Sequence, residues 1–174
     1  MKVCERYSRF NDEGYEVLYV LAIRTGLRRG ELLGLRWSDV DLEEAGKLRV
    51  IRQLQRRRDG GGGVFFSPPK SGKERVIRLT PPAIDALKRH RARQGEEKLK
   101  AGGLYEDQDL VFATEKGTPL DPPNIDRRSF KPLLERAGLP NIRFHDLRHA
   151  AALPWGASQG GAGDTRAREY QPHP

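Results

Sequence analysis

Arginine, lysine and histidine residues stand at three places where their neighbours indicate a turn or the start of a helix. Arg28 lies between two glycines, where the backbone can let a phosphate group approach closely, and Glu31 follows on the neighbouring helical face, where it can orient the arginine. Lys70 lies in a proline- and glycine-rich turn between two predicted strands. His145 and Arg148 are spaced i, i+3 on one helical face.

Side chains of these types can act on a phosphodiester bond. Cleavage without a metal ion needs cations on the non-bridging oxygens, a nucleophile in line with the scissile bond, and an acid for the leaving oxygen. Arginine suits the first task because its planar guanidinium grips two oxygens and stays charged. A lysine or a histidine can serve as the acid. The three segments therefore offer a phosphate clamp and an acid.

Each segment also has a simpler interpretation. Arg28 alone is compatible with a surface arginine at a helix N-terminus, and Lys70 alone with a solvated lysine at a hairpin tip. His145 and Arg148 are also compatible with a metal-binding pair or with the exposed polar start of a helix. A metal site needs more carboxylate or cysteine ligands than the sequence places nearby, so we expect no metal.

Positive charge is concentrated in the middle of the chain. Residues 49–93 hold 13 basic and 3 acidic residues, a net +10, whereas the whole chain carries +8. Such a block is typical of a protein that binds a phosphate backbone, although a solvated basic surface without a partner has the same composition. The residues expected to contact nucleic acid are Arg49, Arg52, Arg56, Arg57, Arg58, Lys73 and Arg75.

The composition fits a single domain without a membrane partner. A chain of 174 residues can bury one sizeable core. It has no run of 18 apolar residues and no apolar stretch at its start, so we expect neither a membrane span nor a secretory signal. The single cysteine, Cys4, excludes an internal disulfide and a multi-cysteine zinc site. These features predict a soluble, cytoplasmic protein.

Periodicity predicts a mainly α fold with a small three-stranded antiparallel β-sheet. Helices are expected over residues 13–24, 30–37, 81–101 and 124–137 and from about residue 145, and strands over residues 48–54, 64–66 and 75–79. Gly26 and Gly138 are placed to end helices, and Thr80 is placed to cap one. Residues 154–174 contain no leucine, isoleucine or valine, so residues 153–174 are expected to form a disordered tail after a domain over residues 13–152.

Together the three segments resemble the tyrosine recombinase family, the phage-integrase type of DNA breaking–rejoining enzyme. Residues 25–41 match its motif Thr-Gly-Leu-Arg-x-Gly-Glu-x-x-x-Leu-x-Trp-x-Asp-Val/Ile-Asp almost completely, with Arg28 as the arginine. Lys70, in a turn before a basic strand, is similar to the family's lysine. Residues 145–149 read His-Asp-Leu-Arg-His, identical to the usual form of its His-x-x-Arg motif. The likeness covers roughly residues 15–152.

The resemblance implies a role for each residue. Arg28 and Arg148 would clamp the scissile phosphate of double-stranded DNA and stabilise its pentacoordinate transition state. Lys70 would protonate the departing 5′ oxygen, His145 would assist proton transfer or hold the phosphate, and Glu31 would support Arg28. A tyrosine would attack to give a 3′-phosphotyrosyl intermediate. The family needs no metal and no nucleotide cofactor, and it acts as tetramers on DNA.

The C-terminal region departs from the family pattern. A Leu-Gly-His segment and the nucleophilic tyrosine should follow residues 145–149, yet neither is recognisable. Tyr170 is a poor candidate because it is closer to Arg148 than is usual in the family, and Pro172 and Pro174 oppose a helix around it. A reading frame shifted by one nucleotide permits family-like sequence after residue 153. We therefore hypothesise a frameshift near Leu153, with a naturally divergent tail as the alternative.

The sequence before the first predicted helix is also short. About 14 residues precede it, so we expect no core-binding or arm-binding domain. The resulting expectation is an incomplete catalytic domain for site-specific DNA recombination or integration, monomeric and inactive alone because the nucleophile segment is missing. The alternatives are a non-catalytic basic DNA-binding remnant and a basic helical module unrelated to DNA.

Overall fold

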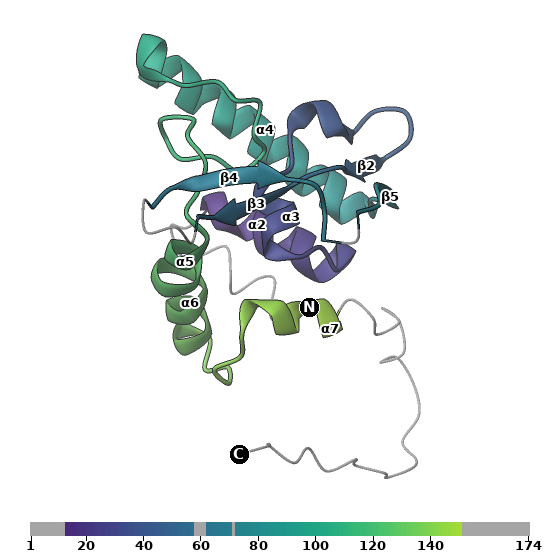
Figure 1. Cartoon of the computed structure of the whole chain (residues 1–174), viewed down its shortest axis with the longest axis vertical. Coiled ribbons are helices and arrows are strands. Elements are labelled where there is room, and N and C mark those ends of the chain that lie inside the picture. Colours follow the sequence, from purple (N-terminus) through teal and green to yellow (C-terminus); the bar gives the residue numbers. More distant parts are fainter. Residues whose placement is uncertain (1–12, 58–61, 71, 151–174) are drawn as a thin grey trace.

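The computed structural model of the chain describes residues 13–57, 62–70 and 72–150. Arg58, Tyr170 and the tail for which a frameshift was hypothesised lie outside the described residues. The fold is mainly helical with small antiparallel sheets, which confirms the predicted fold class (Figure 1). The helices are α2 (Glu13–Thr25), α3 (Arg29–Leu33), α4 (Pro81–Ala101), α5 (Pro122–Ile125), α6 (Lys131–Arg136) and α7 (Leu147–Ala150), and the strands are β1 (Val40–Asp41), β2 (Lys47–Val50), β3 (Gln53–Arg56), β4 (Val64–Ser67) and β5 (Arg75–Arg78).

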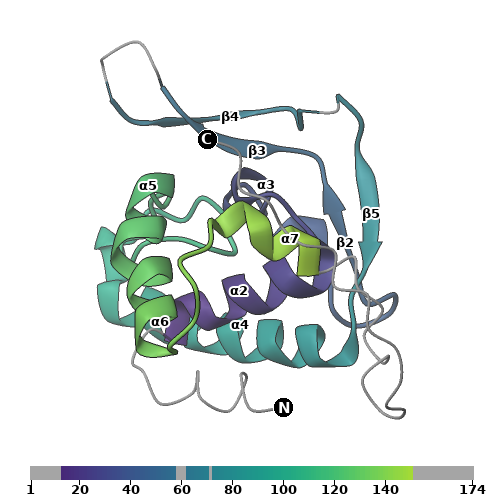
Figure 2. The same ribbon diagram turned by 90° about the horizontal axis from the view of Figure 1, so that it is seen from below.

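Helix α2 forms the centre of the molecule. Leu18 and Leu21 of this helix are fully buried, and the helix packs against α3, α4 and α7. Figure 2 shows α4 running along the side of this helical layer opposite the β3–β4 hairpin. The predicted helices over residues 13–24 and 81–101 are confirmed, and Pro81 opens α4 as expected. Thr80 holds the N-cap position, but its side chain makes no capping hydrogen bond. None of the described helices has both the length and the apolar character that crossing a bilayer requires.

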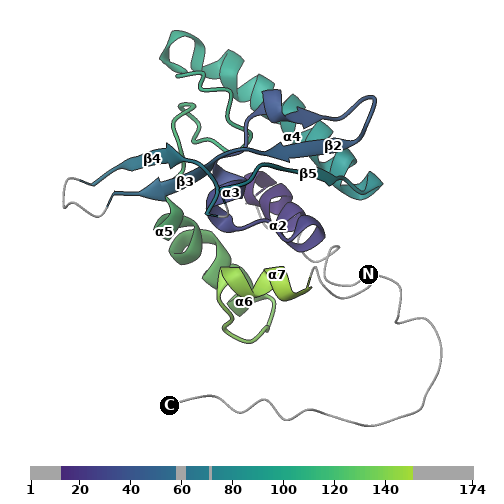
Figure 3. The same cartoon turned by 45° about the vertical axis from the view of Figure 1, so that its right-hand side comes forward.

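The strands form two small sheets, and the predicted single strand over residues 48–54 is wrong. One sheet has the order β1-β2-β5 and the other is the β3–β4 hairpin, so β1 was missed and β4 belongs to a different sheet from β5 (Figure 3). The extended chain leaves one strand after Val50 and enters the next at Gln53, so Ile51 and Arg52 belong to neither strand. This break allows Arg52 to pair with the buried carboxylate of Asp39 and brings β3 against α3.

Helix α3 and strand β3 approach each other closely because two glycines face the strand. A Cβ added to Gly30 would lie 2.8 Å from the carbonyl oxygen of Leu54, and one added to Gly34 would lie 3.0 Å from the Cα of Gln53. The sequence suggested that a glycine beside Arg28 admits a phosphate group. In the structure the space beside Gly30 is instead filled by the β3 backbone.

The remaining predicted helices form with adjusted bounds. The helix expected over residues 30–37 ends at Leu33, and a 3₁₀ turn follows at Trp37–Asp39. The helix expected over residues 124–137 is helical from Pro122 to Arg136, with a π-helical turn at Asp126–Phe130. Gly26 and Gly138 both have a φ of 64°, the left-handed conformation that favours glycine after a helix.

Candidate active site

Arg28 immediately precedes α3, and Glu31 fixes it there. The Glu31 side chain is 1% exposed, and its Oε2 atom accepts a hydrogen bond of 2.8 Å from the Arg28 backbone N–H. Its Oε1 atom lies 3.2 Å from Nη1 of Arg28. The Nε and Nη2 groups of Arg28 make no hydrogen bond within the described residues. The guanidinium is therefore held at one nitrogen and keeps two donors for another group.

Arg75 binds the same carboxylate from strand β5. Its Nη1 and Nη2 groups donate to the two Glu31 oxygens at 3.0 Å and 2.7 Å, the bidentate geometry that suits arginine and carboxylate. Burial of Glu31 opposes its ionisation, but the hydrogen bonds from Arg75 and from the Arg28 backbone outweigh burial and lower its pKa. Glu31 is therefore a carboxylate at neutral pH, and the cluster of two arginines and one glutamate keeps one positive charge.

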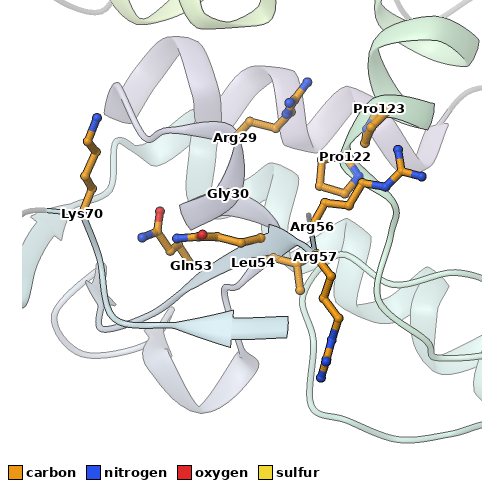
Figure 4. Close-up of a pocket in the computed structure, with 10 residues that line it drawn as sticks. Arg29, Gly30, Gln53, Leu54, Arg56, Arg57, Lys70, Pro122 and Pro123 are labelled. Carbon is orange, nitrogen blue, oxygen red and sulfur yellow. The ribbon is translucent and has the colours of Figure 1, made fainter. Parts of the chain in front are cut away.

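Lys70 lies at one end of a groove whose charged lining residues are all basic. Figure 4 shows Lys70 at one end, Gln53 in the middle, and Arg56 with Pro122 at the other end. The cavity measures about 580 Å³, and Arg29, Arg57 and Leu54 also line it. The Lys70 side chain is exposed and makes no hydrogen bond or ion pair within the described part of the chain. A basic groove of this kind attracts polyanions.

His145 and Arg148 are positioned by a buried aromatic residue between them and α6. Phe144 is 5% exposed, and its ring packs 5.4 Å from that of Phe130 and 6.0 Å from that of Tyr19 on α2. This contact anchors the 3₁₀ turn Phe144–Asp146, which leads directly into α7. His145 is exposed and Arg148 is half-buried, and no ion pair of Arg148 occurs among the residues described.

The residues predicted to contact nucleic acid fall into two groups. Exposed side chains are those of Arg49, Arg56, Arg57 and Lys73. Arg52 and Arg75 instead pair with buried carboxylates, Arg52 with Asp39 and Arg75 with Glu31. Their contact with nucleic acid stays a prediction, but their guanidinium groups already have partners inside the protein.

Sequence reasoning missed Arg29 as a residue of this surface. Arg29 lines the groove with Lys70 and forms an ion pair with Asp126 in the π-helical turn. The sequence signal that could have identified Arg29 is its position directly after Arg28. The described residues contain no group of three or more histidine, cysteine, aspartate or glutamate side chains placed to hold a metal ion.

Comparison with known proteins identifies the family. The sequence profile of the phage integrase family matches residues 1–154. The chain belongs to the phage integrase family of tyrosine recombinases. It is 39% identical to a "Tyrosine recombinase XerC-like" of Caldanaerobacter subterraneus subsp. tengcongensis over 79% of this chain and 37% of that protein. It is 32% identical to an integrase of Streptomyces ambofaciens over 75% of this chain and 34% of that protein.

Solved structures of integrases and recombinases show the same fold. The Tn1549 transposon integrase, in complex with transposon right end DNA, matches with a TM-score of 0.64 and 24% identity over 80% of this chain and 45% of that one. XerA recombinase matches with a TM-score of 0.63 and 24% identity over 86% and 45%. The lambda integrase catalytic core matches with a TM-score of 0.56 and 19% identity over 86% and 75%. The chain thus spans less than half the length of the curated relatives named above.

Proposed function

We propose that this integrase-family chain forms the catalytic part of a site-specific DNA recombinase, which cuts and rejoins strands through a 3′-phosphotyrosyl intermediate. The observation that carries the proposal is Arg28, which the buried Glu31 fixes with two donor groups left for a phosphate. The relatives named as recombinases and integrases support it, and so does the Tn1549 integrase, which was solved in complex with DNA.

In this proposal the described residues supply the clamp and the acid. Arg28 and Arg148 bind the non-bridging oxygens of the scissile phosphate and stabilise the charge that develops there. Lys70 protonates the departing 5′ oxygen, and its exposed ammonium group, which has no partner within the described part of the chain, is available for that step. His145 assists proton transfer or holds the phosphate. The basic groove beside Lys70 binds the DNA backbone around the cleaved bond.

The nucleophilic tyrosine belongs, in this proposal, to residues beyond those described or to a second copy of the chain. Tyr15 packs against the core, and the buried hydroxyl of Tyr19 donates a 2.7 Å hydrogen bond to Ser129. Burial and the nearby carboxylates of Asp107 and Glu97 raise the pKa of Tyr105, which opposes formation of its phenolate. None of these three tyrosines is arranged to attack a phosphate, so in this proposal the described residues bind DNA but do not supply the nucleophile.

A first experiment measures binding to a pool of duplexes over a range of salt concentrations. Wild-type protein should bind with a steep loss of affinity as salt rises, since phosphate contacts release counterions. Arg28→Ala and Arg148→Ala should weaken binding while far-ultraviolet circular dichroism shows an intact fold. Salt-independent binding would contradict the proposal, and unfolding of either variant would make that arginine structural.

A second experiment separates an enzyme from a DNA-binding remnant. The clamp and the acid do not depend on which group attacks, so hydrogen peroxide added with a chelator should cut the bound strand in place of tyrosine. Lys70→Ala should abolish this cleavage, whereas Lys47→Ala, another exposed lysine, should not. Binding without peroxide-dependent cleavage would favour the non-catalytic alternative. An SDS-resistant adduct formed without peroxide would show that the chain carries its own nucleophile.

A further inference from the structure

Strand register shows which way Arg75 faces. In the antiparallel pair β2–β5, Arg75 lies opposite Val50, which is 2% exposed, and Arg78 lies opposite the exposed Lys47. Directly opposed residues of an antiparallel pair share one face of the sheet. Arg75 is therefore directed toward the protein interior, and Arg78, three residues later, is directed toward solvent.

The contacts of Arg75 and Arg28 with Glu31 differ in kind. Arg75 uses both of its terminal nitrogens on the carboxylate, at 3.0 Å and 2.7 Å, whereas Arg28 uses a single side-chain nitrogen at 3.2 Å. Bidentate pairs of this type are strong and fix geometry, because two parallel hydrogen bonds set the plane of the carboxylate. Arg75 thus sets the orientation of Glu31. Glu31 in turn presents Oε2 to the backbone N–H of Arg28 and Oε1 to its guanidinium.

We propose that Arg75 is a positioning residue rather than a DNA contact: through Glu31 it fixes the Arg28 guanidinium for the phosphate. This inference rests on the function proposed above. The same ion pair joins the turn that carries Lys70 to the start of α3, because Arg75 is the first residue of the strand after that turn. This ion pair therefore fixes the position of Arg28 relative to the turn that carries Lys70.

Removal of Arg75 changes the charge balance around Glu31. The carboxylate is 1% exposed, so it cannot turn to water, and Arg28 is its one other side-chain partner among the described residues. A buried carboxylate without sufficient partners is costly, and Arg28 must then bind it more fully. The donors of Arg28 are drawn away from the phosphate, so DNA binding weakens although Arg75 never touches DNA.

A double-mutant cycle on DNA affinity tests this dependence. Arg75→Gln should weaken DNA binding by about tenfold, a typical size for coupled contacts, and should have no further effect in an Arg28→Ala background. Arg78→Gln, which removes the same charge from the solvent-facing side of β5, should have an equal effect in both backgrounds. An undiminished Arg75→Gln effect in the Arg28→Ala background would overturn the inference and make Arg75 a direct contact.

A spectroscopic measurement without DNA tests the positioning role of Arg75 independently of the proposed function. In the free protein, the ¹H–¹⁵N signal of the Arg28 side chain should move and exchange at a different rate in Arg75→Gln but not in Arg78→Gln. Arg75→Lys, which keeps the charge but loses the bidentate geometry, should restore the signal in part. An unchanged Arg28 signal in Arg75→Gln would refute the positioning role, whether or not the chain binds DNA. A changed signal in a chain that fails to bind DNA would contradict only the proposed function.

Discussion

Replacement of Gly30 by alanine should separate α3 from β3 and destabilise the protein. The new Cβ would lie 2.8 Å from the carbonyl oxygen of Leu54, whereas ordinary contacts begin near 3.4 Å, so the strand backbone must retreat by about 0.6 Å. Backbone cannot rotate away as a flexible side chain can. Overpacking of this kind costs roughly 1–3 kcal/mol, and the better helix propensity of alanine returns at most about 1 kcal/mol.

Gly95→Ala is a matched control within the same chain. Gly95 lies in α4, and a Cβ added there has nothing within 4 Å. This variant should therefore gain roughly 0.5–1 kcal/mol of stability through propensity alone. The two identical substitutions are thus expected to change stability in opposite directions.

Urea unfolding followed by circular dichroism measures both effects. We expect Gly30→Ala to lose about 1–2 kcal/mol and several degrees of Tm, since 1 kcal/mol corresponds to roughly 2–4 °C in a chain of this size. Its DNA affinity should also fall, because Arg28 immediately precedes the displaced helix. Gly30→Ala protein that is as stable as wild type, with Gly95→Ala stabilised as expected, would refute the packing argument.

Three further changes test charges and hydrogen bonds in the interior. Burial lowers the pKa of His90, so the unfolding free energy should fall as pH drops below about 6.5, where the unfolded chain takes up the proton first; urea titrations across pH should show this step, and His90→Phe should remove it. Because the pKa of Glu31 is lowered, its ionised form stabilises the fold above about pH 4.3, and this stabilisation is lost as the pH falls further. Glu31→Gln should therefore make the unfolding free energy less dependent on pH below that value in the same titrations. Tyr19→Phe should cost about 1 kcal/mol by removing the hydrogen bond to Ser129, and a cost near zero in urea unfolding would show that this bond is replaced.

The sequence predicts the helices well because their signals are local. Proline at the first position of α4 and the glycine after α6 mark boundaries within a few residues of the chain. The strand break at Ile51 and Arg52 has no such signal. It depends on the carboxylate of Asp39, 13 residues away, and on the fit of β3 against Gly30 and Gly34. Long-range pairing of this kind decides where a strand ends, and periodicity does not report it.

Polar residues of the core are hidden for the same reason. His90 resembles a polar residue on a charged helix, yet it is 6% exposed and its ring packs in a tilted arrangement against Trp37 and against Phe112. Its Nε2 group lies 2.6 Å from the carbonyl oxygen of Val111. Only the packing of α4 on the segment after it makes this histidine a core residue, so the prediction named the surface cations and missed it.

Within the described residues, the same short pattern, an arginine followed three residues later by a carboxylate, occurs at three turns. Glu31, Asp39 and Asp146 each accept a hydrogen bond from the backbone N–H of the residue three positions earlier, at 2.8, 3.2 and 2.9 Å. The three carboxylates differ in how deeply their side chains are buried.

Asp146, whose side chain is 29% exposed, is paired with Arg143 of its own turn. The side chains of Glu31 and Asp39 are instead buried, and each binds an arginine from outside its own turn. Glu31 binds Arg75 of β5, and Asp39 binds Arg52, which lies between β2 and β3. A buried carboxylate requires a cation beside it because water cannot solvate it. Basic residues in and between the strands therefore serve two purposes. Arg52 and Arg75 pair with carboxylates inside the protein, whereas exposed arginines such as Arg49 and Arg56 are placed where a phosphate backbone can reach them.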